Sequence, residues 1–101
     1  MGRIIILGDE EFKNQLTSTD DLNSISDGTY YCAGVVSSSC PAHIPSVIPT
    51  GAERTLLIRQ IWRGHMVIQL LMTVEDGIFY RGKWTGGSSS YFSSWSKVAT
   101  T

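Results

Sequence analysis

The sequence predicts a small, mainly β domain (a β-rich α+β class) whose strands form an antiparallel meander. Three segments with strand composition follow one another between residues 55 and 84, separated by short turns. The second turn contains Asp76-Gly77, and glycine accepts the positive φ that a tight reversal needs. Three prolines at four-residue spacing exclude a continuous helix or a central strand between residues 37 and 50.

The first third of the chain predicts short, mixed elements. An apolar strand and then a short amphipathic helix, with Phe12 and Leu16 on one face, are expected up to Thr17. Asp20 and Asp21 supply N-cap chemistry and predict one short helical turn. After a turn at 27–28, strands are expected at 29–33, 55–62, 66–74 and 78–84, with a last strand ending at 98.

Alternation along the second of the three strong strands predicts which side chains share a face. Met66, Ile68, Leu70, Met72 and Val74 form an unbroken apolar row, and we expect this row to face the core. In the opposite row, Val67 to Thr73, half of the side chains are apolar. A sheet with one solvated face is usually less apolar than this on that face. Either the N-terminal half or a neighbouring subunit is therefore expected to cover the second face.

Size and charge limit the classes of function. The 101 residues make one domain, and only 17% of them are charged, against an average of about 25%. Some apolar surface is therefore expected to be buried against another subunit. The net charge is −1 with no basic stripe, which argues against nucleic-acid binding. The longest apolar run, Met66 to Met72, is too short to span a membrane.

Cysteine and histidine usage gives no sign of a metal or a cofactor. Cys32 and Cys40 enclose a short loop that a disulfide is able to close, but two cysteines do not make a disulfide-rich scaffold, and we expect free thiols. Adding His43 and His65 gives a spacing that matches no standard zinc site. The apolar patch after Met1 is too brief for a signal peptide. It reads as a first strand or as the stub of a larger protein, and we favour the stub.

Catalytic constellations are missing from the sequence. It contains no G-x-S-x-G elbow, HExxH or glycine-rich phosphate loop. The serines cluster in turn-like runs, and the acidic pairs read as solvated turn and cap residues. A protein that is not an enzyme is the expectation.

Aromatic and cationic residues of the last third instead predict a binding surface. Tyrosine and tryptophan suit positions with one apolar and one wet edge, and arginine or lysine beside them is able to bind sugar hydroxyls or anionic sugars. By alternation Tyr80 and Trp84 share one face of their strand, while Phe79, Arg81 and Lys83 share the other. Packing is the alternative role for each ring. The candidate ligand-binding residues are Trp62, Arg63, Tyr80, Arg81, Lys83, Trp84 and Tyr91.

Two motifs frame the chain from about Asp20 to Ala99. The first reads Asp21-Leu22-Asn23-Ser24-Ile25 and continues through Asp27-Gly28-Thr29-Tyr30-Tyr31. The second joins Ile78-Phe79-Tyr80-Arg81-Gly82 to the closing Trp95-Ser96-Lys97-Val98, with Gln69 in the strand before it. With these motifs in this order, the chain resembles the pyocin-knob family, whose members are small domains near the C-termini of phage and pyocin tail fibres. Its segment from Cys32 to Pro49 is longer than the family suggests, and we interpret it as a variable, specificity-setting loop.

The resemblance implies a mostly β knob that assembles as a homotrimer at the tip of a tail or head fibre. It implies adsorption of the virion to a bacterial surface polysaccharide or another host receptor, with fibre shaft and virion proteins as further partners. The expected location is the virion, after synthesis in the host cytoplasm. Residues 1–19 would link to a shaft and residues 20–101 would form the knob. A purely structural trimerisation cap and a polysaccharide depolymerase fragment are the alternatives.

Overall fold

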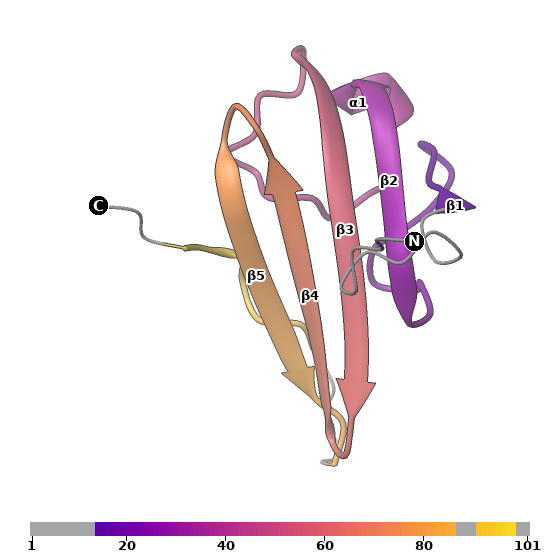
Figure 1. Cartoon of the computed structure of the whole chain (residues 1–101), viewed down its shortest axis with the longest axis vertical. Helices are drawn as coiled ribbons and strands as arrows, with labels where there is room; N and C mark the ends of the chain where they lie inside the picture. The colour runs from indigo at the N-terminus through magenta and orange to yellow at the C-terminus, as the bar shows by residue number, and fades with distance from the viewer. Residues whose placement is uncertain (1–13, 87–90, 99–101) are drawn as a thin grey trace, which may run out of the picture.

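A computed structural model describes residues 14–86 and 91–98, which form one six-stranded sheet with its strands in sequence order (Figure 1). The strands are β1 (Asn14–Gln15), β2 (Gly28–Val35), β3 (Glu53–Arg63), β4 (Met66–Thr73), β5 (Gly77–Trp84) and β6 (Ser96–Lys97). Neighbours from β2 to β6 pair antiparallel, whereas β1 pairs parallel with β2. The predicted mainly β class with an antiparallel meander is confirmed.

The long strands lie where their composition predicts them. β3, β4 and β5 each begin and end within two residues of the expected bounds, because β-branched, aromatic and other apolar residues are frequent in them. Both connecting turns hold a glycine at positive φ, 59° at Gly64 and 101° at Gly77. β2 begins one residue before the predicted strand and ends two residues after it, and β6 is only a two-residue pairing with β5.

The predicted helical turn at Asp20 or Asp21 is wrong. Asp21 lies in extended backbone, where it forms an isolated parallel bridge with Ala42. Its carboxylate accepts from the Asn23 N–H at 2.8 Å and its carbonyl accepts from the Ser24 N–H at 2.9 Å. Asp21 therefore initiates a turn instead of capping a helix. The helix α1 (Val36–Ser39) lies instead within the segment expected to be a loop, next to the end of β2 (Figure 1).

The N-terminal region contributes to the same sheet and core. Residues up to 13, including the expected first strand and Phe12, lie outside the described residues. Asn14 and Gln15 are extended and pair with Tyr30 and Tyr31, so this part of the expected helix is a strand. Leu16 is buried in the core. No helix among residues 14–86 and 91–98 is long and apolar enough to cross a membrane.

The core lies on one face of the sheet, and it is not the face that we expected. On β4 the buried row is Val67, Gln69, Leu71 and Thr73, whereas Val74 is 98% exposed and Met66 is 47% exposed. The prediction that the row from Met66 to Val74 faces the core is therefore wrong. Segments 16–25 and 36–48 cover the row from Val67 to Thr73 instead. The N-terminal half therefore supplies the cover, which is the first of the two alternatives given above. These segments contribute Leu16, Leu22, Val36, Cys40 and Ile48 to the core.

A chain of amides and one guanidinium joins the centre of the sheet to the covering segment. The Gln69 amide donates to the Leu22 carbonyl and to Gln60 Oε1, the latter at 2.7 Å, and accepts from Arg81 Nε at 2.8 Å. Gln60 in turn donates to the Ile25 carbonyl at 2.8 Å. Since β3, β4 and β5 place these three side chains side by side in register, the polar chain crosses the buried face of the sheet. It explains why the row with Gln69 faces inward.

The two cysteines lie in contact inside the core as thiols. Their sulfur atoms are 3.3 Å apart, Cys32 donates to Cys40, and both residues are buried. Burial, together with the neighbouring Cys40 sulfur, raises the pKa of the Cys32 thiol well above its usual range. The thiolate is the reactive form, so this thiol is expected to be inert in the folded protein.

We expect Cys32 and Cys40 to react with Ellman's reagent at pH 8 about tenfold or more slowly in the folded chain than in urea. Each unit by which the pKa of Cys32 is raised lowers its thiolate fraction about tenfold, and burial blocks access of the reagent to both sulfur atoms. Stopped-flow absorbance, with and without urea, measures both rates. If the unfolded chain shows no thiol until a reductant is added, the pair is a disulfide and the prediction of free thiols is wrong.

Candidate functional site: an aromatic and cationic cleft

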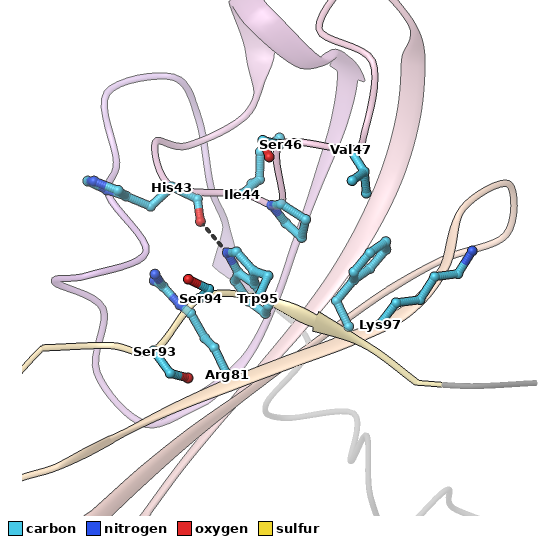
Figure 2. Close-up of a pocket in the computed structure, with 11 residues that line it drawn as sticks. His43, Ile44, Ser46, Val47, Arg81, Ser93, Ser94, Trp95 and Lys97 are labelled. Carbon is cyan, nitrogen blue, oxygen red and sulfur yellow. Dashed lines mark hydrogen bonds between the residues drawn. The ribbon is translucent and has the colours of Figure 1, made fainter.

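A cleft of about 530 Å³ opens on the core side of the sheet. Its walls come from the loop 43–47, from the inward side chains of β5 and from the segment 93–97 (Figure 2). Segments far apart in the sequence therefore build it together. Figure 2 shows the Trp95 indole between Arg81 and the loop that carries His43 and Ile44.

Hydrogen bonds hold the aromatic wall of the cleft in place. Trp95 Nε1 donates to the His43 carbonyl at 2.7 Å, which ties the C-terminal segment to the proline-rich loop. His43 has a positive φ of 72°, a conformation that non-glycine residues rarely adopt. Its ring Nδ1 lies 2.6 Å from the Asp21 carboxylate, which fixes the loop from the other side. A strained backbone held by specific contacts is often found at binding sites.

The Asp21 carboxylate belongs to this arrangement. The Asn23 N–H holds the pKa of Asp21 below its ordinary value, and the hydrogen bond and charge of His43 act in the same direction. Asp21 is therefore ionised at neutral pH and orients the His43 ring. It does not line the cleft.

Arg81 lies at the floor of the cleft and is 5% exposed. Besides Gln69, it bonds the Asn23 side chain, with Nη2 donating to Oδ1 at 2.8 Å. Its guanidinium carbon lies 4.0 Å from the centre of the Phe92 ring and 4.7 Å from that of Trp95, both cation–π distances. Burial lowers the pKa of Arg81 to about 10, so the group stays charged at neutral pH.

A second, smaller hollow of about 290 Å³ adjoins Arg81; we call it the side hollow. Asn23, His43, Arg81, Lys83, Tyr91 and Phe92 line it. The Lys83 ammonium lies 4.8 Å from the centre of the Phe92 ring. Arg81 therefore separates two hollows, and each has aromatic and cationic walls.

The sheet face opposite the core is a different kind of surface, and we call it the outer face. Its apolar side chains are Leu57 and Ile61 on β3, Met66, Ile68, Leu70 and Met72 on β4, and Ile78, Tyr80 and Trp84 on β5. By the same alternation Arg59 lies on this face as well, between Leu57 and Ile61 and opposite Leu70. Tyr80 is 47% exposed and Trp84 is 60% exposed. Because Gly82 has no side chain, a shallow, mostly apolar hollow of about 330 Å³ lies between them. Contiguous exposed apolar surface is often part of an interaction site.

The structure divides the predicted binding residues between three places. Arg81, Lys83 and Tyr91 line the side hollow, and Arg81 also lines the cleft. Tyr80 and Trp84 lie on the outer face, as the alternation along β5 predicts. Trp62 and Arg63 lie at the exposed end of β3, where the Trp62 indole donates to the Gly64 carbonyl at 3.0 Å. One continuous site containing all seven residues does not form.

Sequence reasoning missed several residues of the cleft. His43, Ser93, Ser94, Trp95 and Lys97 line it but were not among the candidates. Trp95 and Lys97 belong to the closing motif, and His43 lies in the loop that we interpreted as setting specificity, so both signals were present. No group of three or more His, Cys, Asp or Glu side chains gathers as in a metal site in the part of the chain that the structure describes.

Comparison with protein-family models, with curated proteins and with solved structures finds no match to this chain.

Proposed function

We propose that this chain is the distal knob of a bacteriophage fibre and that it attaches the virion to a saccharide of the bacterial surface. The observation that carries the proposal is the cleft, in which the Trp95 indole lies against the Arg81 guanidinium, with Ser93 and Ser94 near them and Lys97 at the far end. An aromatic ring offers a flat apolar surface to a sugar ring, and the groups around it are able to bind hydroxyls. The resemblance to the pyocin-knob family points to the same function.

In this proposal the two sides of the sheet have different roles. The outer face contacts sister chains in a homotrimer, since its side chains are apolar and open in a single chain. The cleft lies on the opposite side of the sheet and stays accessible in such a trimer. Trp84 then serves assembly, whereas Arg81 and Trp95 serve ligand binding.

A structural cap that only ends and registers a trimeric fibre is the second candidate. The outer face favours it equally, because a cap also needs sister chains to cover Tyr80 and Trp84. It assigns no role to the cleft. The two candidates therefore differ in a single outcome, binding to host cells.

We expect a fluorescent fusion of the full chain to stain the cells of a host strain, and to lose this staining when the surface polysaccharide is stripped. Ser94→Trp, which would fill the cleft, is expected to lower staining about tenfold or more, equivalent to about 1.4 kcal/mol. Flow cytometry measures the staining. Ser38→Trp is the matched control, because Ser38 is exposed on α1 and does not line the cleft. A folded trimer that stains no strain in a broad panel would leave the structural cap as the function.

A further inference from the structure

Arg81 is a buried cation without a carboxylate beside it. Its hydrogen-bond partners Gln69 and Asn23 are neutral amides. The carboxylate contacts found among residues 14–86 and 91–98 are made by His43 and Arg54 instead. Burial of an unpaired charge is costly, and the lowered pKa of Arg81 reflects this cost. Packing alone does not favour the burial of a guanidinium that has no anion beside it.

Part of the Arg81 guanidinium remains free to bind. A guanidinium carries five N–H groups, and Arg81 donates one from Nε and one from Nη2. No fully buried side-chain nitrogen among the described residues lacks a partner. Since Nη1 makes no hydrogen bond to the described residues, it must keep some contact with solvent, and Arg81 lines both hollows.

The side chains near Arg81 add positive charge to the two hollows that it lines. Lys97 lines the cleft and Lys83 lines the side hollow, whereas no Asp or Glu of the described chain lines either one. Asp21 is the carboxylate whose charge acts on Arg81, and it already accepts from the Asn23 N–H and contacts the His43 ring. An anion that enters these hollows therefore meets an excess of cations.

We propose that the cleft and the side hollow bind an acidic saccharide, with its oxyanion against the Arg81 guanidinium and its sugar ring against the Trp95 indole. This inference rests on the proposed function and adds the charge class of the ligand. A carboxylate matches the planar fork of a guanidinium, which gives both strength and orientation. The oxyanion is the shared chemistry of two bacterial sources, the uronic acids of capsular polysaccharides and the phosphodiesters of teichoic acids.

The test uses the full chain and four polymers of known chemistry. Alginate and hyaluronan carry uronic acids, polyglycerol phosphate teichoic acid carries phosphodiesters, and dextran is neutral. We expect a uronic-acid polymer or the teichoic acid to bind in biolayer interferometry, and dextran not to bind. Reduction of the uronic carboxyls to alcohols is expected to weaken binding about tenfold or more. Binding of the teichoic acid alone would assign the phosphodiester source.

Nuclear magnetic resonance locates the bound anion. The Arg81 Nε–H and Trp95 Nε1–H signals are expected to shift together as the binding polymer, in oligosaccharide form, is titrated. Lys83→Gln is expected to weaken the binding about threefold or more, since it removes one cation of the side hollow and none of the hydrogen bonds of Arg81. Arg63→Gln is the matched control, because it removes one cation at the exposed end of β3. Equal weakening by both variants would indicate a net-charge effect and overturn the assignment.

Failure of this inference differs from failure of the proposed function. If the fusion stains host cells but carboxyl-reduced and neutral polymers bind as well as the acidic ones, the knob binds a neutral saccharide and the inference is wrong. If the chain stains no cells and binds none of the polymers, the proposed function fails with it.

Discussion

Replacing Gln69 with methionine is expected to lower the free energy of unfolding by about 3–6 kcal/mol. Gln69 is fully buried, and both hydrogens of its amide are used, one by the Leu22 carbonyl and one by Gln60 Oε1. Its oxygen accepts from Arg81 Nε. Methionine has a similar length but leaves three buried groups without a partner, at about 1–3 kcal/mol each and more for the charged one. The total free energy of unfolding of a typical domain is only about 5–15 kcal/mol.

Urea unfolding at pH 7 and a fixed chain concentration, followed by tryptophan fluorescence, measures this loss. Gln15→Met is the matched control, because Gln15 is exposed on β1 and the same substitution there leaves no buried group without a partner. We expect the control to change stability by about 0.5 kcal/mol or less. A Gln69→Met chain as stable as the control would mean that the polar chain across the sheet contributes nothing measurable.

The sequence predicts the strands of this fold well but not the side of the sheet that is covered. Alternation identifies which side chains share a face, as it does for Tyr80 with Trp84 and for Phe79 with Arg81. It does not say which face receives a cover when both rows of β4 are apolar. The cover consists of irregular segments without periodicity, and it is held by the bonds that Gln69 and Arg81 make to Leu22 and Asn23. Such pairings between distant residues leave no local sequence signal.

The candidate site was predicted in part for the same reason. Arg81, Lys83 and Tyr91 were identified from composition, because rings and cations cluster near them in the sequence. The cleft itself depends on the contact between His43 and Trp95, which lie 52 residues apart. The positive φ of His43 is equally invisible in the sequence, because it comes from the contacts at either side of that residue. The helical turn at Asp21 failed because an aspartate side chain initiates turns and caps helices with the same hydrogen bond to a nearby N–H.

The outer face supports the second large prediction, that the chain is a trimer which Ile68→Glu converts to monomers. Ile68 is half-buried at the middle of the outer face, in register with Ile61 on β3 and with Gly82 on β5. A glutamate there would place a charge in each subunit interface, with Ile61 and Gly82 directly opposite it and the cations Arg59 and Arg63 only at diagonal positions on β3. In a single chain the same glutamate reaches solvent, so the sheet itself is expected to stay folded. Three interfaces weakened together are enough to abolish the trimer at micromolar concentration.

Sedimentation equilibrium measures the mass, which is expected to be three times 11.1 kDa for the unmodified chain and 11.1 kDa for Ile68→Glu. Far-UV circular dichroism checks that the variant keeps its β structure. Val74→Glu is the matched control, because Val74 is also apolar but 98% exposed in the turn between β4 and β5, and it is expected to remain trimeric. An unmodified chain of monomer mass at micromolar concentration would remove both the fibre knob and the structural cap. In that case the apolar side chains from Leu57 to Trp84 would need a partner other than the chain itself.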